Sequence, residues 1–256
     1  MDYVEMVVLR LVRAAILAAA GAAVTLAQLN LPSEQFWGGQ RALLWVGVVI
    51  LACFICYDAA RSVNYAVQAT RIREYDNDVR ASLSAAVSQI VSVTGVPWDE
   101  VTVRYYCRRP RLSRARLVQV GAVLAGADLI DAQIAVVPGV GVAGIAFDEQ
   151  VCVIEEWRQF ARAATRQGRE PWEKRSKRDR YGLNWGQLRR SPQPEGVLAA
   201  PTFSHDGQPN GCILVSGRIK LSDLEGDDMA DVVNDLTTVL DVLGSPPAGW
   251  WGAHAR

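Results

Sequence analysis

Glycines at positions 139, 141 and 144 match the G-x-G-x-x-G spacing with which some proteins hold the pyrophosphate of a dinucleotide. That chemistry needs a long helix after the glycines and an acidic residue about 20 positions further on. Only residues 145–150 separate Gly144 from the next strand-like run, so a helix that crosses a sheet does not fit. We therefore predict that these glycines serve the backbone, by allowing positive φ or close packing, and do not contact a phosphate.

The stretch from 157 to 195 combines aromatic and basic side chains, which together can bind a planar anion. An aromatic ring can stack on such a ligand while an arginine pairs with its anionic group. A charge run of this kind is also typical of a solvated basic helix that lies over a sheet, and both interpretations stay open. The residues concerned are Trp157, Trp172, Tyr181, Trp185, Arg158, Arg162, Arg166, Arg169, Lys174, Arg175, Lys177, Arg178, Arg180, Arg189 and Arg190.

A second basic run, RYYCRRPRLSRAR at residues 104–116, contains six arginines and no acidic residue. It surrounds a predicted hairpin turn, and it would suit anionic lipid headgroups if the domain is held close to a membrane. Nucleic acid is the rival partner. We do not expect it, because no groove-reading or base-stacking motif accompanies the arginines.

Cysteine and histidine are the residues from which a metal centre or a nucleophilic site would be built. The chain has five cysteines and two histidines, His205 and His254, which is too little for a zinc cluster or a histidine-based triad. Three of the cysteines lie in apolar strand-like runs and two, Cys53 and Cys56, in an apolar helix-like run. We interpret them as packing residues. We predict no metal site and no catalytic residues, and the sequence identifies no cofactor.

Two uncharged segments, residues 14–29 and 42–57, suit the hydrocarbon core of a bilayer better than water. We predict that they form a two-helix transmembrane hairpin; two buried helices of a soluble bundle, or a cleaved signal peptide at the first segment, are the alternatives. The arginines near the hairpin place both termini in the cytoplasm, with a multi-pass topology in the inner (plasma) membrane. These arginines are Arg10, Arg13, Arg61, Arg71 and Arg73.

Beyond the hairpin the hydrophobic period changes from that of a helix to that of strands. Neither glycine nor proline occurs between Gly47 and Gly95, so the second membrane helix is expected to continue into the cytoplasm, with an apolar stripe from Ile72 to Val93. The order of elements predicts an α+β domain with a central antiparallel sheet flanked by helices. Its strands are predicted at residues 101–109, 115–125, 151–156, 196–203 and 210–218, followed by a helix at 224–243.

Two segments make this domain resemble a GAF domain, a small-molecule sensor module. They are PGVGVAGIAF at 138–147 and VLAAPTFSHDGQPNGCILVSG at 197–217, which is similar to the family's strand, turn and strand hairpin. The resemblance covers about residues 79–244. It implies that the glycine segment leads into a short helix beside a ligand pocket, and that the segment from 157 to 195 covers the ligand.

On this resemblance we predict a ligand-binding site of Phe147, Trp157, Arg180, Tyr181 and Trp185, with Arg180 as the partner of an anionic group. The run Phe147-Asp148-Glu149 is only a fragment of the Asn-Lys-Phe-Asp-Glu pattern of cyclic-nucleotide-binding relatives. The Cys-His pair of bilin-binding relatives is missing, and the cysteines do not match those of a related reductase of free methionine sulfoxide. The ligand class therefore stays open, with a nucleotide among the candidates.

The predicted organisation is a transmembrane hairpin at residues 1–60, a juxtamembrane helical linker at 61–78, the GAF-like domain at 79–244 and a C-terminal tail at 245–256. We predict a membrane-anchored cytoplasmic sensor or binding module, not an enzyme. It would bind a small anionic ligand and pass the signal to its transmembrane helices or to a partner. The alternatives are a nucleotide-activated effector that permeabilises the membrane in a bacterial immune system, and a cysteine-dependent redox enzyme of GAF fold.

The predicted partners are the membrane, the small-molecule ligand and further copies of the chain. The first and last helices of the domain each carry an apolar stripe, and together these stripes offer more surface than one sheet face needs. The alternative is that both stripes pack on the sheet of their own chain. Small residues at every fourth position, Ala14, Ala18 and Ala22, allow membrane helices to approach closely. These features favour a homodimer or a higher homo-oligomer.

Overall fold

The computed structural model describes residues 14, 16, 18–26, 28–29, 41–109, 116–124 and 136–254. The chain divides into two compact units, Met1–Ala69 and Thr70–Arg256. Helix α3 (Arg41–Thr94) has residues in both units and is unbroken, as the lack of glycine and proline after Gly47 predicts. The helix ends at Thr94. The next residue, Gly95, has a φ of 67°, and its amide donates to the Val91 carbonyl.

In the first unit, α3 is the one helix among the described residues that is long and apolar enough to cross a membrane. Core helices of soluble proteins and signal sequences can have the same length and apolar composition, so this helix alone does not establish a membrane anchor. Residues 18–26 are also helical, and Ala20 and Val24 lie beside Gly47 of α3. The flanking residues 1–13 and 30–40 lie outside the described part. A two-helix hairpin and a multi-pass topology therefore stay predictions.

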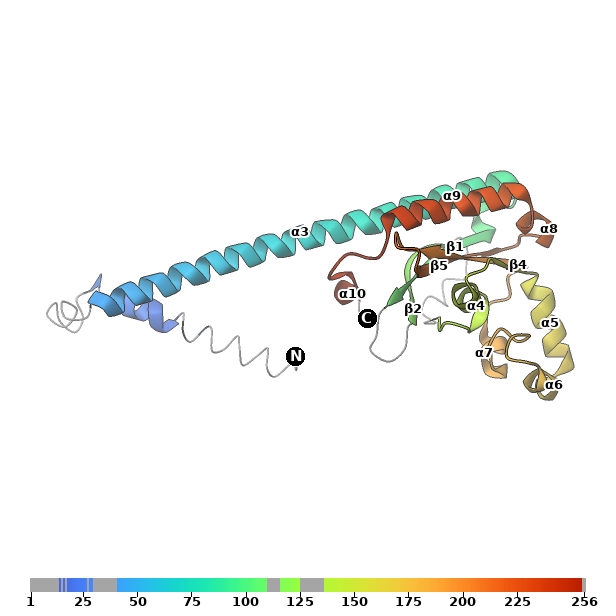
Figure 1. Cartoon of the computed structure of the whole chain (residues 1–256), viewed down its shortest axis with the longest axis horizontal. Helices are drawn as coiled ribbons and strands as arrows, with labels where there is room; N and C mark the ends of the chain where they lie inside the picture. Colours follow the sequence, from blue (N-terminus) through green and yellow to red (C-terminus); the bar gives the residue numbers. More distant parts are fainter. Residues whose placement is uncertain are drawn as a thin grey trace. The chain divides into compact units, whose positions relative to one another are not determined.

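The second unit is built on a five-stranded antiparallel sheet, in the order β2-β1-β5-β4-β3 within the described residues. Figure 1 labels four of these strands, β2, β1, β5 and β4. The five predicted strands are confirmed, each with ends within about two residues of the expected ones. Their bounds are β1 (Val101–Arg109), β2 (Arg116–Leu124), β3 (Val153–Glu155), β4 (Gly196–Phe203) and β5 (Pro209–Gly217). The predicted turn between β1 and β2, at 110–115, lies outside the described residues.

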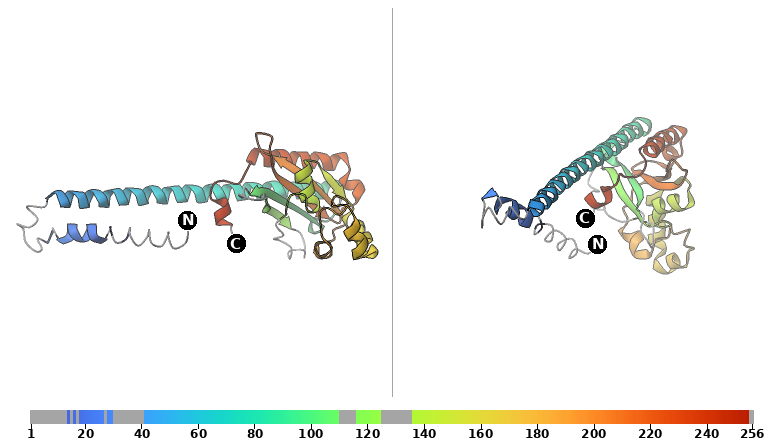
Figure 2. Two further views of the ribbon diagram at one scale, coloured as in Figure 1. Left: turned by 60° about the horizontal axis from the view of Figure 1, so that its bottom comes forward. Right: turned by 60° about the vertical axis from the view of Figure 1, so that its left-hand side comes forward.

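One face of the sheet is covered by the second-unit part of α3 and by α9 (Asp227–Leu243), which lie side by side (Figures 1 and 2). A short 3-10 helix, η1 (Trp98–Glu100), leads from α3 into β1, and α8 (Leu221–Leu224) precedes α9. Apolar side chains at helical spacing on both helices are buried against the sheet, as their periodicity predicts. They include Val79, Leu83, Ile90, Met229, Leu236 and Leu240.

The other face of the sheet is covered by four helices, which pack a second apolar cluster against it (Figure 1). These are α4 (Gly141–Glu149), α5 (Trp157–Gln167), α6 (Arg169–Lys174) and α7 (Trp185–Arg190). The segment from 157 to 195 thus contains three short helices. The predicted α+β fold, with an antiparallel sheet flanked by helices, is confirmed.

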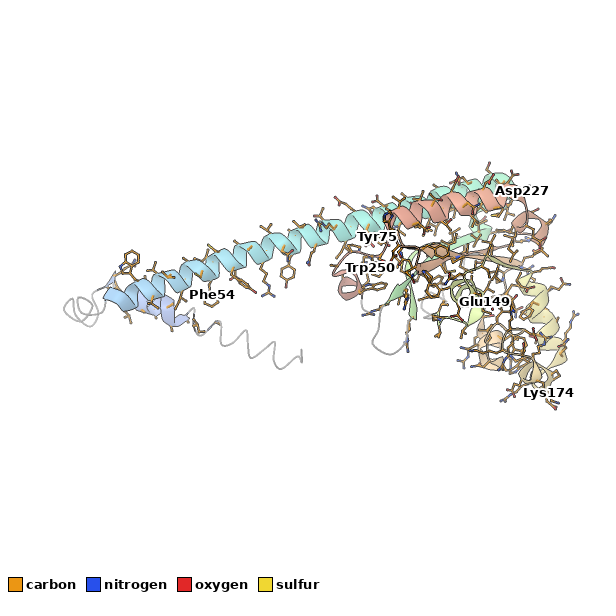
Figure 3. The ribbon with its side chains drawn as sticks, viewed as in Figure 1. Phe54, Tyr75, Glu149, Lys174, Asp227 and Trp250 are labelled. Atoms are coloured by element: carbon orange, nitrogen blue, oxygen red, sulfur yellow. The ribbon has the colours of Figure 1, made fainter. Side chains whose placement is uncertain are left out.

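The residues expected to form a C-terminal tail include a last helix, α10 (Trp250–Ala253), which packs against α3 within the second unit. The Trp250 indole is 2% exposed, and its Nε1 donates to the Asp76 carboxylate over 2.6 Å. The Tyr75 hydroxyl donates to the Gly244 carbonyl just before this segment. Figure 3 labels Tyr75 and Trp250, whose side chains lie near one another at the end of α9.

Candidate ligand-binding cavity

The glycines of the G-x-G-x-x-G spacing shape the backbone at the start of α4. Gly139 and Gly141 have φ values of 74° and 72°, so the predicted positive φ is confirmed. Gly144 has no room for a Cβ, which would lie 2.4 Å from the Val137 carbonyl oxygen. Helix α4 has nine residues and leads directly to β3, so no sheet-crossing helix follows the glycines.

The same turn is held against the segment that links α6 to α7. The Gly141 amide donates to the Tyr181 carbonyl over 2.7 Å. Gly182, with a φ of 64°, approaches so closely that a Cβ there would lie 2.2 Å from the Gly139 carbonyl oxygen. Because only glycine allows this approach, the first turn of α4 has a fixed position above the sheet.

A cavity of about 320 Å³ lies between the sheet and the first turn of α4. Such a volume is at the lower end of the range found for small-molecule sites, roughly 300–1,000 Å³. Strands β1, β4 and β5 supply one side, through Arg104, Tyr106, Val197, Leu214 and Ser216. The remaining lining residues are Val136, Val137, Val140, Gly141, Val142, Ala143, Trp157, Leu183, Gln187, Arg190, Ser191, Pro192 and Pro194.

Arg104 is the buried charged residue of this cavity. Its side chain is 9% exposed, and strands β2 and β5 flank it, with Ala122 and Leu214 as its register partners. Its Nε has no hydrogen-bond partner, and none of the ion pairs among the described residues includes it. Arg104, the first arginine of the basic run 104–116, is therefore enclosed, because β1 is an interior strand of the sheet and this position lies under the helices.

The described residues that line the cavity carry a net positive charge. Arg104 and Arg190 are among them, and none of these described lining residues is an aspartate or a glutamate. The first turn of α4 adds a partial positive charge, because the amides at a helix N-terminus point outward without intrahelical acceptors. No side chain caps this turn, whose N-cap residue is Val140. These walls can bind an anion and would repel a cation.

Of the five residues predicted to bind the ligand, Trp157 lines the cavity. Its Nε1 donates to the Pro192 carbonyl over 3.0 Å, which fixes the indole beside the chain that leads into β4. Tyr181 contacts it edge to ring, with 5.6 Å between ring centroids, but lines a neighbouring depression that also includes Glu155. Burial and then the hydrogen bond to the Glu155 carboxylate raise the pKa of the Tyr181 hydroxyl, so Tyr181 acts as the donor.

The other three predicted residues do not line the cavity. Phe147 is buried in the apolar cluster under α4, and Trp185 begins α7 and packs at the edge of the same cluster. Arg180 is partly buried with an unpartnered Nε. The structure therefore brings Trp157 and Tyr181 into contact. Phe147 and Trp185 belong to the same apolar cluster, and Arg180 precedes Tyr181 in the chain.

Sequence reasoning missed Arg104, Arg190 and Gln187 as lining residues. The signal for Arg104 was its place inside the apolar run VTVRYYC, two residues from Thr102 and from Tyr106 on the same face of the strand. An arginine within a strand that is covered on both faces has to be enclosed. Further arginines follow Arg104, and together they resemble an exposed basic run, so the sequence does not single out Arg104 as a buried residue.

The cysteines of the second unit are separate from the cavity. Burial raises the pKa of the Cys107 thiol to about 12 and also raises the pKa of Cys212. Cys107 lies in the cluster under α3 and α9, whereas Cys212 lies in the cluster on the opposite face of the sheet. Among the described residues, no group of three or more histidine, cysteine, aspartate or glutamate side chains could hold a metal ion.

Comparison with solved structures finds similar chains of low sequence identity. The reduced free methionine-R-sulfoxide reductase of Staphylococcus aureus is 10% identical, with a TM-score of 0.39, and the match covers 69% of this chain and 94% of that one. The type II enzyme of Thermoplasma acidophilum is 14% identical, with a TM-score of 0.40 and coverage of 67% and 98%. A GAF domain of A. aeolicus in an inactive state is 14% identical, with a TM-score of 0.38 and coverage of 69% and 94%.

These likenesses concern the fold alone, which is GAF-like. No family model matches the sequence, and no curated protein matches it. The prediction that the chain is not an enzyme is corrected by the same comparison. Solved structures of this fold include free methionine-R-sulfoxide reductases, so the fold does not exclude catalysis.

Proposed function

We propose that the chain is a membrane-anchored, GAF-like binding module that holds a small anionic ligand in the cavity beside the first turn of α4. The observation that carries this proposal is the lining of that cavity, which among the described residues includes two arginines and no carboxylate. A concave apolar site with a few polar groups is the usual form of a small-molecule site. Ligand binding would be passed to α3, which packs on the opposite face of the same sheet through Val79, Leu83 and Ile90.

The change in environment along α3 supports the membrane anchor. In the first unit most of its large apolar side chains are exposed, with Trp45 at 69% and Ile55 at 66%. In the second unit the apolar side chains of the same helix are buried against the sheet. A contiguous exposed apolar surface of this kind is unfavourable in water, and lipid is the solvent that suits it.

The experiment that tests this proposal fills the cavity with a large side chain. Leu214→Trp places a large side chain on the β5 side of the cavity, whereas Val239→Trp changes an exposed position on α9 and is the matched control. The full-length chain in detergent is screened by thermal shift against anionic metabolites, including cyclic nucleotides. We expect the Tm shifts caused by the hits to disappear in Leu214→Trp and to persist in Val239→Trp. Hits that stabilise both variants equally would place the binding site elsewhere.

A further inference from the structure

We infer that the anionic group of the ligand binds between the Arg104 guanidinium and the first turn of α4, and that the ligand is a small ring compound bearing one carboxylate or phosphate. This inference rests on the proposed function and specifies its ligand. It moves the anion partner from Arg180, which the sequence favours, to Arg104. Three observations carry it: the burial of Arg104, the uncapped start of α4, and the size and polarity of the cavity.

The first observation is a buried cation that has no counterion among the described residues. Arg104 is 9% exposed, its Nε has no partner, and none of the described residues that line the cavity carries a negative charge. Removing a charge from water is costly unless an opposite charge compensates, and a guanidinium cannot become neutral in a protein. Its planar fork of donors matches the two oxygens of a carboxylate or a phosphate. An oxyanion in the cavity would therefore satisfy this side chain.

The second observation is the start of α4, which lines the same cavity. The Gly141 amide is used by the Tyr181 carbonyl. The Val142 and Ala143 amides have no acceptor among the described residues, and the valine at the N-cap cannot supply one. Unsatisfied amides and the helix dipole together make a helix start favourable for an anion. This site and Arg104 come from separate elements and favour the same charge.

The third observation limits the rest of the ligand. Apart from the two arginines, Gln187 and two serines, the cavity walls are apolar or aromatic, with Trp157 among them. The cavity volume of about 320 Å³ is at the lower end of the range for small-molecule sites, roughly 300–1,000 Å³. One ring with a short anionic substituent suits this volume better than a dinucleotide does. Arg190, which is exposed, would contact the ligand from the side of α7.

The experiment replaces Arg104 by a side chain of similar shape without charge. The full-length chain and its Arg104→Met variant are titrated in detergent with phenylacetate, phenyl phosphate and the neutral phenylacetamide. We expect an anionic probe to bind at least about tenfold more weakly to Arg104→Met, because hydrogen bonds to charged groups are among the stronger ones. Phenylacetamide should be unaffected by the substitution. Phenylacetate and phenyl phosphate together distinguish a carboxylate site from a phosphate site.

A second readout does not depend on the probes. If Arg104 serves the ligand, removing its uncompensated charge should raise the Tm of the ligand-free chain. If Arg104 has only a structural role, Arg104→Met should lower the Tm. Arg180→Met, at a partly buried arginine that does not line the cavity, should leave the affinity for the anions unchanged. Arg104→Lys keeps the charge but loses the fork, so intermediate affinity is expected, and this variant replaces Arg104→Met if the latter does not fold.

The outcomes separate the two proposals. Anions that bind Arg104→Met as tightly as the unchanged chain, or a lower Tm for that variant, would overturn the inference and leave the cavity as a ligand site. The same holds if phenylacetamide binds as tightly as phenylacetate and both are lost in Leu214→Trp. If no probe and no metabolite hit is sensitive to Leu214→Trp, the proposed function fails as well.

Discussion

At the residue scale, close backbone approach rather than ligand contact explains the glycines around α4. Gly182 and Gly207 share a positive φ, at 64° and 74°, but only Gly182 has a neighbour that a Cβ would strike. We expect Gly182→Ala to destabilise the chain by about 2 kcal/mol or more, since the clash with the Gly139 carbonyl adds to the backbone strain. The corresponding fall in Tm is roughly 4–8 °C.

Gly207→Ala is the matched control for this prediction, because a Cβ at that position meets nothing within 4 Å. It should cost about 1 kcal/mol, which is the strain of the positive φ alone. Thermal unfolding followed by circular dichroism measures both variants. Equal Tm values for the two would show that the approach of Gly182 to Gly139 does not hold α4 in place.

The sequence predicts the role of the glycines at this site better than it predicts which charged residues line the cavity. The short spacing between Gly144 and the next strand excludes a sheet-crossing helix, so the backbone role of Gly139 and Gly141 follows from neighbouring residues alone. The burial of Arg104 is not local. Thr102 and Arg104 alternate with apolar residues along β1, a pattern typical of a strand with one face in water, yet residues 101–107 are all buried. Which arginine meets the cavity depends on the pairing of β1 with β5.

At the element scale, the strands and the two long helices were predictable because their hydrophobic periods persist over many residues. The elements between β3 and β4 were not. Helices α6 and α7 have six residues each, fewer than two turns, so no amphipathic period can develop. Helix α7 instead begins at a capping box formed by Asn184 and Gln187, a signal that the surrounding arginines obscured.

The C-terminal helix α10 is short but anchored by one large side chain. Trp250 is buried in the cluster under α3 and α9 and donates to Asp76, and His254 stacks on its ring with 4.2 Å between centroids. We expect Trp250→Ala to cost about 3–5 kcal/mol, because it leaves a cavity in the core and removes the hydrogen bond to Asp76. Trp98→Ala, at a site 61% exposed, should change stability by less than about 0.5 kcal/mol.

Chemical denaturation of the full-length chain, followed by tryptophan fluorescence and circular dichroism, compares the two variants. If Trp250→Ala unfolds at the same denaturant concentration as Trp98→Ala, the segment after Gly244 adds nothing to the core. The sequence alone could not predict this packing. A tail rich in glycine and proline has no periodic pattern, and only the fold brings Asp76 next to it.

At the scale of the whole molecule, α3 has two different surroundings along its length. Its apolar residues from Val79 to Ile90 are covered by the sheet and α9, whereas most of those from Trp45 to Ile55 are exposed. The hydrophobic run and the absence of helix breakers made this helix predictable from the sequence. Whether a second spanning helix accompanies it depends on residues outside the described part. The anchor, the cytoplasmic orientation and self-association therefore remain proposals.

The exposed apolar surface of α3 predicts where the chain partitions. We expect the full-length chain to remain with membranes after washing at high salt and alkaline pH, because burial of apolar surface in lipid does not depend on charge. A chain that lacks residues 1–69 should move to the soluble fraction. The double variant Val239→Ser and Val242→Ser, at exposed apolar positions on α9, should stay with the membrane and serves as the control. Release of the full-length chain by the salt wash would mean that the contact is electrostatic, and α3 would then need another partner for its apolar surface.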